Sequence, residues 1–165
     1  MKAFHALLMA SGIALLSACA TYEPQLGATR DEVRSRWGEP TGAYPLPAGM
    51  QRLEFASGPY GRTTWMVDVQ PDGRVQAARQ VLNEAEFLNV QIAAARGLSR
   101  DELLQLIGRP GERRHGGWQG GQVWSWRYPT NDCLWFQVSI TDQGQVRDGA
   151  YGVDPACDTP PDARD

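Results

Sequence analysis

The sequence predicts an α+β fold of two tandem helix–β–β–β units, in which helices cover one face of an antiparallel meander sheet. Three observations lead to this prediction. The chain has 18 glycines and 11 prolines, which favours a turn-rich β-containing fold over a helical bundle. A twelve-residue phrase at residues 29–40 recurs at residues 99–110. Each copy is followed by segments of alternating apolar and polar residues, the pattern of half-buried strands.

The first residues have the features of an export signal and not of a folded element. Lys2 precedes an apolar run that is too short and too interrupted to span a bilayer comfortably. We therefore expect a signal peptide over residues 1–18. The run ends in Leu-Ser-Ala-Cys, and this ending resembles the lipobox of bacterial lipoproteins. The resemblance implies that Cys19 is acylated; the alternative is an ordinary signal peptide followed by a chance cysteine.

An acylated Cys19 would hold the mature chain on a membrane, because each buried acyl CH₂ contributes about 0.8 kcal/mol. Residues 19–25 would then be the lipidated linker to the first folded unit. Ala20 follows the cysteine. By resemblance to enteric sorting, a residue other than aspartate at this place implies the outer membrane, with the protein facing the periplasm.

Two cysteines remain downstream, Cys133 and Cys157. Cysteines of exported proteins usually pair, because they meet an oxidising compartment. We predict a disulfide between them that closes the C-terminal segment onto the last sheet; two buried free thiols are the alternative. Residues 158–165 are rich in proline and charge, and we expect them to form a disordered tail.

The repeated phrase predicts a short capped helix in each unit. Both copies place a hydroxyl N-cap three residues before a glutamate and end in Gly-x-Pro, whose glycine offers a left-handed turn. The positions are Thr29, Glu32, Gly38 and Pro40 in the first copy and Ser99, Glu102, Gly108 and Pro110 in the second. A further helix is expected over residues 83–97, with Asn83 as N-cap and Phe87, Val90 and Ile92 as apolar contacts. The second unit therefore has two helices.

Three strands are expected after each capped helix. They lie at residues 53–55, 65–70 and 75–82 in the first unit and at residues 124–128, 135–141 and 146–153 in the second. Turn glycines at Gly73 and Gly144 keep nearly the same offset as the two helices. We therefore divide the folded region into a first unit at residues 26–82 and a second unit at residues 83–157.

The strand pattern also predicts which side chains point away from the helices. Trp124, Trp126 and Tyr128 should point into the core, which leaves Arg127 and Trp135 on the opposite face, with Arg52 in the first unit. Because tryptophan and arginine dominate binding hot spots, this polar face is a candidate protein-binding surface. The alternative is a half-solvated sheet without a partner.

The stretch from residue 113 to residue 121 is predicted to be a long hairpin loop. It holds Arg113, Arg114 and Trp118 among several glycines. It lacks the lysine and the following helix of a phosphate-binding loop. Contact of these three side chains with lipid headgroups or a protein partner is the functional alternative to a plain connecting loop.

Together these elements resemble the SmpA/OmlA (BamE-like) lipoproteins. The resemblance rests on the lipobox, the capped helix ending in Gly-x-Pro, the strand meander and the turns that contain Gly73 and Gly144. Members of the family carry one such unit, and the two units here are arranged as in β-lactamase inhibitor proteins. The resemblance implies an accessory role in the machinery that inserts β-barrel proteins into the outer membrane.

We expect no enzymatic activity, cofactor or metal site. His115 is the one histidine outside the signal segment, and no cluster of ligand residues has metal-binding spacing. A net charge of −3 argues against a nucleic-acid partner. The expected function is therefore that of a lipid-anchored scaffold or accessory protein of the cell envelope. The alternative is an anchored inhibitor that binds a hydrolase.

Overall fold

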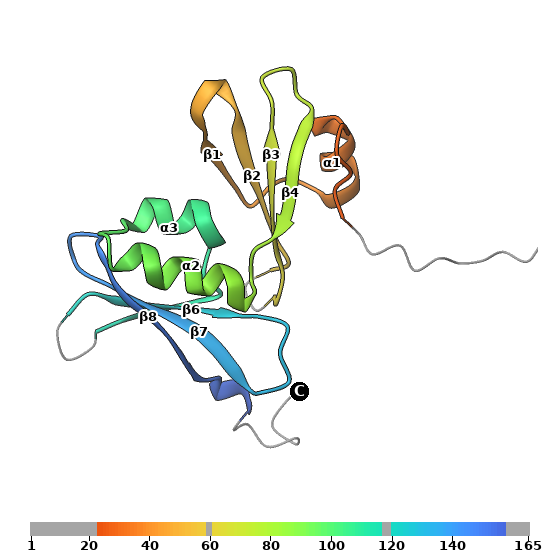
Figure 1. Cartoon of the computed structure of the whole chain (residues 1–165). Coiled ribbons are helices and arrows are strands. Elements are labelled where there is room, and N and C mark those ends of the chain that lie inside the picture. Colours follow the sequence, from red (N-terminus) through yellow and green to blue (C-terminus); the bar gives the residue numbers. More distant parts are fainter. Residues whose placement is uncertain (1–22, 59–60, 117–119, 158–165) are drawn as a thin grey trace, which may run out of the picture.

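A computed structural model describes residues 23–58, 61–116 and 120–157 of the 165-residue chain. Within these ranges the protein has three α-helices and two antiparallel four-stranded sheets, a mixed α+β fold as predicted (Figure 1). The predicted signal peptide, Cys19, Trp118 and the predicted tail lie outside the described residues. No helix within the described residues is long and apolar enough to cross a membrane.

Each sheet has its strands in sequence order. The first sheet contains β1 (Gly42–Pro45), β2 (Gln51–Ala56), β3 (Thr64–Val69) and β4 (Val75–Gln80). The second contains β5 (Glu112–His115), β6 (Gln122–Arg127), β7 (Leu134–Ile140) and β8 (Val146–Val153). The helices are α1 (Arg30–Trp37), α2 (Glu84–Ala94) and α3 (Arg100–Ile107), and the short 3₁₀ turns are η1 (Pro47–Gly49) and η2 (Pro155–Cys157).

The predicted capping boxes are confirmed at the starts of α1 and α3. The Glu32 backbone N–H donates to Thr29 Oγ1 over 3.2 Å, and the Thr29 backbone N–H donates to the Glu32 carboxylate over 2.7 Å. Ser99 and Glu102 make the same reciprocal pair over 3.3 Å and 2.8 Å. These hydrogen bonds lower the pKa of both glutamates, because they favour the charged carboxylate.

The two glycines that end these helices have a less common conformation than the left-handed turn expected. Gly38 has φ 82° and ψ −167°, and Gly108 has φ 76° and ψ −167°. The positive φ was predicted, but the extended ψ places both residues in a region that is essentially restricted to glycine. The chain therefore leaves each helix abruptly and runs directly toward the first strand of its sheet.

The helix expected between the two sheets is confirmed as α2. The Asn83 side chain accepts from the Glu86 backbone N–H, and Phe87 and Val90 are completely buried. The prediction for Ile92 was wrong, because this side chain is 45% exposed. Ile92 lies one turn after the exposed Leu88, on the solvent side of the helix.

The expectation of three strands in each half was also wrong, since a short strand precedes the predicted ones in both sheets. β5 pairs with β6 and contains Arg113 and Arg114, which had been expected in a loop. His115, also expected in a loop, is the last residue of β5. Both β1 and β5 are edge strands, and β5 has no apolar residue that periodicity could detect.

The first sheet is covered by α1 on one face. Six buried apolar residues form this small core: Val33, Leu53, Phe55, Val67, Val69 and Val75. Trp37, at the end of α1, packs edge-to-face against Phe55 and Trp65, with 5.6 Å between ring centroids in each case. Burial of this apolar face explains why α1 forms although it has only eight residues.

The other face of the first sheet packs against the C-terminal half, and α2 and α3 lie between the two sheets (Figure 1). Met66 on β3 belongs to the larger core formed by α2, α3 and the second sheet. Glu54 on β2 is fully buried at this contact. The prediction that this face of the first sheet points to solvent was therefore wrong.

The larger core lies between α2, α3 and the second sheet. Trp124, Trp126 and Tyr128 are all buried there, as predicted from the alternation of β6. Phe87 of α2 stacks on Phe136 of β7 with 4.3 Å between ring centroids. Aromatic rings supply much of the buried area here, and such pairs contribute beyond area burial alone.

The predicted disulfide between Cys133 and Cys157 is confirmed, with 5.9 Å between the two Cα atoms. It joins the segment just before β7 to η2, which follows β8. The C-terminal end of the described chain is therefore held against the second sheet, as expected.

Matching contacts tie each capped helix to the last hairpin of its sheet. Arg30 donates its backbone N–H to the Gly73 carbonyl, and Arg100 donates to the Gly144 carbonyl, both over 2.8 Å. The residues before them form isolated bridges with the residue that directly precedes the last strand of each sheet. The order of elements, the caps and these contacts thus recur in both halves of the chain.

Candidate functional site

The second sheet has one face that none of the described helices covers, and we call it the open face. It contains residues from all four strands, among them Glu112, Arg114, Ser125, Arg127, Trp135, Gln137, Ser139 and Asp148. The helices pack against the opposite side of this sheet (Figure 1). This arrangement leaves the open face as the part of the second sheet that a partner could reach.

Trp135 lies at the centre of the open face, but it is only 1% exposed. The guanidinium groups of Arg114 and Arg127 lie 5.1 Å and 5.3 Å from the centroid of its ring. Trp135 was predicted to be an exposed aromatic, and that prediction was wrong because two long arginine side chains cover it. The accessible part of this cluster is therefore Arg114, whose side chain is 52% exposed, because the Arg127 side chain is only 13% exposed. Both guanidinium groups make cation–π contacts with the tryptophan.

Gln137 links the residues around this tryptophan. In the orientation that satisfies its neighbours, its side-chain oxygen accepts from Arg114 Nη2 at 3.1 Å, Ser125 Oγ at 3.1 Å and Trp135 Nε1 at 3.2 Å. Gly152 on β8 leaves room for the indole of Trp135, since a Cβ at this glycine would lie 3.2 Å from Trp135 Nε1. The polar atoms of the open face are thus held in place before any partner binds.

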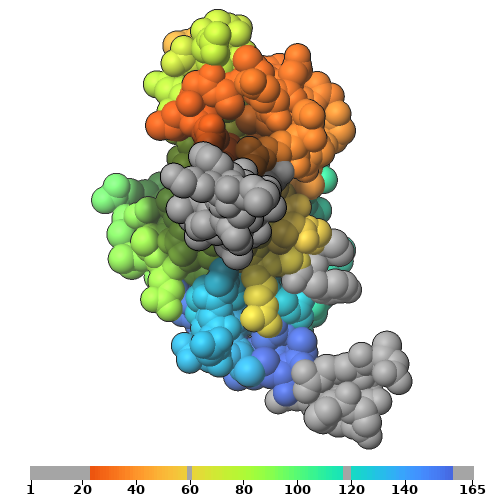
Figure 2. Space-filling model, turned by 90° about the vertical axis from the view of Figure 1, so that its right-hand side faces the viewer, coloured from red at the N-terminus to blue at the C-terminus, as the bar shows by residue number. Residues whose placement is uncertain are grey.

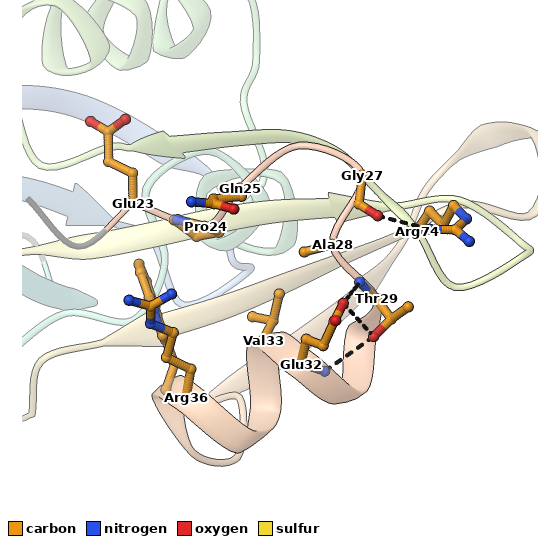
Figure 3. Close-up of a pocket in the computed structure, with 11 residues that line it drawn as sticks. Glu23, Pro24, Gln25, Gly27, Ala28, Thr29, Glu32, Val33, Arg36 and Arg74 are labelled. Carbon is orange, nitrogen blue, oxygen red and sulfur yellow. Dashed lines mark hydrogen bonds between the residues drawn. The ribbon is translucent and has the colours of Figure 1, made fainter. Parts of the chain in front are cut away.

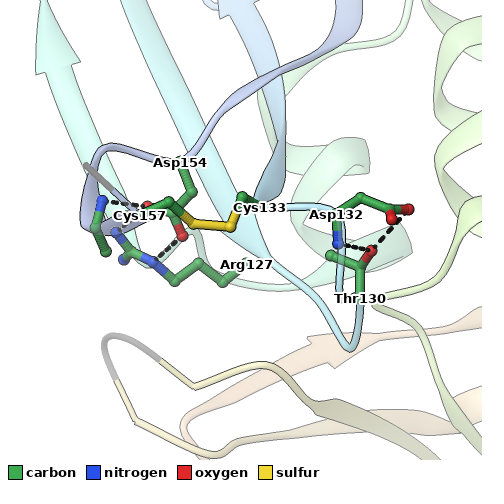
Figure 4. The surroundings of a disulfide bond; sticks show 7 residues. Arg127, Thr130, Asp132, Cys133, Asp154 and Cys157 are labelled. Atoms are coloured by element: carbon green, nitrogen blue, oxygen red, sulfur yellow. Dashed lines mark hydrogen bonds and ion pairs between the residues drawn. A yellow bond between two sulfur atoms is a disulfide. The ribbon is translucent and has the colours of Figure 1, made fainter. Parts of the chain in front are cut away.

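Arg127 is fixed by a bidentate ion pair with Asp154 (Figure 4). The two nitrogen–oxygen distances are 2.6 Å and 2.8 Å, and the Asp154 carboxylate also accepts from the Ala156 backbone N–H. Burial by itself would raise the pKa of Asp154, but the hydrogen bonds from Arg127 and Ala156 outweigh it and lower that pKa. The pair therefore stays charged at neutral pH.

The disulfide supports this ion pair. Cys157 belongs to η2, which begins directly after Asp154, and Cys133 lies directly before β7 (Figure 4). The Asp154 backbone N–H also donates to the Cys133 carbonyl over 2.9 Å. The cross-link thus keeps the aspartate beside Arg127 and, through it, keeps Arg127 over the tryptophan.

Arg52 was also proposed as a partner-binding residue, and the structure places it elsewhere. Its guanidinium forms a bidentate pair with Asp68 over 2.6 Å and 2.7 Å and donates to the Gln105 carbonyl of α3 over 3.0 Å. Arg52 therefore joins the first sheet to α3 inside the molecule. The polar face that no described helix covers in the second sheet is thus packed against α3 in the first sheet.

Arg113 points to the helix side of β5 and is likewise separate from the open face. Its guanidinium lies 4.4 Å from the centroid of the Trp124 ring. Of the six candidate binding residues, the structure brings Trp135, Arg127 and Arg114 together. Arg52 and Arg113 lie elsewhere, and Trp118 lies outside the described residues.

Glu54 is a buried carboxylate on the same face of β2 as Arg52, the face that was expected to point outward. It accepts hydrogen bonds from Thr41 Oγ1 at 2.9 Å, Tyr44 Oη at 2.5 Å and the Arg109 backbone N–H at 3.3 Å. Burial and the bond to this carboxylate raise the pKa of Tyr44. The Glu54 carboxylate thus joins the first sheet to the turn after α3. A glutamate between Leu53 and Phe55 gives no signal of burial in a pattern of alternating residues.

A hollow of about 570 Å³ lies beside α1, apart from the open face (Figure 3). It is lined by the segment from Glu23 to Thr29 and by residues of α1, with Arg74 at one side. Two of its polar groups have structural tasks: Glu32 caps α1, and Arg74 donates to the Gly27 carbonyl over 3.0 Å.

Among the described residues no cluster of three or more histidine, cysteine or acidic side chains could hold a metal ion. His115 is exposed, and its nearest polar partner is the Gln122 side chain at 3.5 Å. The arrangement of the open face is suited to binding by cation–π contacts and hydrogen bonds.

The comparisons with known proteins identify no family for this chain. No protein-family model and no curated protein matches the sequence. A cysteine-rich secretory protein from Staphylococcus aureus subsp. aureus Mu50 is a weak structural neighbour, with 11% identity and a TM-score of 0.30. The match covers 79% of this chain and 44% of that protein's chain. At this TM-score neither fold nor function can be carried over.

Proposed function

We propose that this protein is a lipid-anchored accessory or scaffold protein of the bacterial envelope that binds another protein through its open face. In this proposal the fold consists of two tandem BamE-like units, each a capped helix followed by an antiparallel sheet. The signal segment and the lipobox-like sequence before Cys19 support the anchor. The recurrent caps and helix-to-hairpin contacts support the tandem arrangement.

The open face carries the binding part of the proposal. A tryptophan flanked by two arginines has the composition of an interface hot spot. Its side chains are already fixed by Gln137 and by the Arg127–Asp154 pair, so that little side-chain entropy would be lost on binding. The single observation on which the proposal depends is this pre-formed arrangement on a sheet face that no described helix covers.

The proposed anchor places the open face away from the membrane. Cys19 lies four residues before Glu23, which limits their separation to roughly 14 Å. The segment coloured orange in Figure 2 forms one end of the molecule, and β8, in blue, lies toward the other end. The second sheet would therefore extend into the periplasm, where a partner can reach it.

The experiment that tests this function has two parts. Mass spectrometry of the mature protein should find diacylglycerol and an amide-linked acyl chain on Cys19, and Cys19→Ser should release the protein from the membrane fraction.

Cross-linking in intact envelopes, followed by purification, should then identify the bound protein. An outer-membrane assembly subunit as main partner supports the accessory role, whereas a soluble hydrolase supports an anchored inhibitor. An unmodified Cys19 would contradict the anchor.

A further inference from the structure

The outer edge of β8 is covered at its start. β8 is the last strand of the second sheet and pairs with β7 along its inner edge. On the outer side, the Val146 N–H donates to the Leu98 carbonyl over 2.9 Å, and the Gly149 carbonyl accepts from the Gln91 side chain over 2.8 Å. The first part of this edge is therefore held by α2 and by the segment just before α3.

The last part of the same edge has free backbone groups. The Asp154 N–H donates to the Cys133 carbonyl, directly after the last pair of the β7–β8 ladder. Hydrogen-bonded and non-hydrogen-bonded pairs alternate in an antiparallel ladder, so Gly152 bonds to β7, whereas Tyr151 and Val153 turn their N–H and C=O groups outward. Within the described ranges, no hydrogen bond reaches these outward groups. We call these two residues the free edge of β8.

Exposed apolar side chains surround the free edge. Val153, Leu88 and Tyr151 are 62%, 55% and 41% exposed. Tyr151 and Val153 are two residues apart, so their side chains share the face of β8 that looks toward α2. There Tyr151 contacts Phe87, with 6.2 Å between ring centroids (Figure 1). The free edge thus combines unpaired backbone groups with apolar surface.

Leu88 forms the wall of this surface on the α2 side. It follows Glu84 by one turn, and Gln91 lies near both on the same side of the helix. Both neighbours act on β8: Gln91 bonds to its backbone, and Glu84 contributes, after burial and Tyr128, to raising the pKa of Tyr151. Leu88 therefore lies above the free edge, and the exposed Glu84 is the charged rim beside it.

The other sheet edges are protected in ways that the free edge of β8 is not. β1 has four residues and ends in Pro45, and β5 consists of four polar or charged residues. On β4, the outward carbonyl of Gln80 accepts from the Asn83 side chain over 2.9 Å. Prolines, charges and short length all discourage the addition of a strand. Residues 149–153 contain only glycine, alanine, tyrosine and valine.

The free groups indicate an extended strand as their partner. Outward N–H and C=O groups recur at every second residue, roughly 7 Å apart, which is the spacing that another extended backbone offers. The residues after Cys157 do not match, because they include two prolines and have Ala163 as their only other apolar residue. Two copies of β8 paired about Tyr151 would bring their two Glu84 carboxylates together, which disfavours a second copy.

We propose that the free edge of β8 binds an extended segment of a different protein, which adds a fifth strand to the second sheet. The backbone of that segment would pair with Tyr151 and Val153, one of its apolar side chains would rest on Leu88, and a basic residue would lie beside Glu84. This edge is separate from the open face. The inference therefore goes beyond the proposed function and adds a second binding surface.

The experiment uses the full-length mature chain in detergent and a synthetic peptide of alternating valine and threonine with a lysine at each end. Hydrogen exchange followed by NMR should be fast at Tyr151 and Val153 in the free protein and at least about tenfold slower with the peptide. The Gly152 N–H, which bonds to β7, should exchange slowly in both states. The same peptide with methyl groups on its valine and threonine nitrogens is the matched control, and it should produce no slowing.

A pair of variants provides the second readout. Val153→Pro removes one outward N–H and leaves the ladder with β7 intact, whereas Val153→Thr keeps that N–H. Fluorescence anisotropy should show peptide binding weakened at least about tenfold by the proline and less than about threefold by the threonine. Urea unfolding checks that both variants are folded.

Three results would overturn the inference: equal binding by the two variants, equal binding of the methylated peptide, or unchanged exchange at Tyr151 and Val153. Self-association of the unchanged protein that Val153→Pro abolishes would also overturn it, because the occupant would then be a second copy. Neither readout depends on Arg114 or Trp135, so the outcome is independent of the test of the open face.

Discussion

Replacing Gly108 by alanine tests whether the two halves are joined at the turn after α3. The substitution has two costs, and both can be worked out from the structure. A non-glycine residue at φ 76° and ψ −167° costs about 1–3 kcal/mol in backbone strain. The new methyl group would also lie within 3.2 Å of Thr64, Glu54 and Met66, and such overpacking costs about 1–3 kcal/mol more.

Gly38→Ala is the matched control, because it has the same backbone strain without the crowding. We expect Gly108→Ala to lower the free energy of unfolding by about 2 kcal/mol more than Gly38→Ala does. Urea unfolding at neutral pH with the disulfide intact measures both values, and unchanged m-values would show that the comparison is valid. Equal losses of stability in the two variants would refute the packing of this turn against the first sheet.

Three further predictions concern the C-terminal half. Asp154→Asn should lower the free energy of unfolding by about 3 kcal/mol at neutral pH, because it leaves the partly buried Arg127 without its partner. The pKa of Asp154 is lowered in the folded protein, so the stabilisation from its ionised carboxylate is present above the ordinary pKa near 4 and is lost as the pH falls through the lowered pKa. In urea unfolding between roughly pH 2 and 5, the stability of the variant should therefore change less with pH than that of the unchanged protein. The same pH dependence of stability in both proteins would contradict the assignment of this stabilisation to Asp154. Cys133→Ser should cost about 3 kcal/mol, measured by the same unfolding assay under non-reducing conditions, and equal stability of the two proteins would count against the cross-link. Gly149→Ala should cost about 1–3 kcal/mol, because its Cβ would lie 2.6 Å from Phe136 Cζ, and a loss below about 0.5 kcal/mol in thermal unfolding would show that the core can relax around it.

Local signals in the sequence predicted the helices and the longer strands. The capping boxes at Thr29 and Ser99 and the N-cap at Asn83 depend on contacts between residues three positions apart, which a sequence displays directly. The disulfide was predictable because only two cysteines remain after Cys19. Strands with strong alternation, such as β7, were likewise found from their own residues.

The two edge strands could not be found in this way. β5 consists of four polar residues, and its strand conformation comes from its ladder with β6. A strand that buries little of its own surface leaves no apolar period in the sequence. The same limit applies to β1, whose pairing with β2 is visible only once the chain is folded.

Which sheet face stays open was the hardest feature to predict. Both sheets have polar residues on the face opposite their own apolar core, yet one such face packs on α3 and no described helix covers the other. Burial of Glu54 depends on the turn after α3, which is distant in sequence. Burial of Trp135 depends on Arg114 and Arg127, which reach it from neighbouring strands. Periodicity assigns a residue to a face, but it does not show what covers that face.

A photo-activated cross-linker placed at Ser139 tests the central claim most directly, because this residue lies half-buried on the open face. The same cross-linker at the exposed Arg96 is the comparison. In intact envelopes we expect a discrete protein adduct from position 139 and little or none from position 96. If position 139 gives no protein adduct, or both positions give the same products, the open face is not a protein-binding surface.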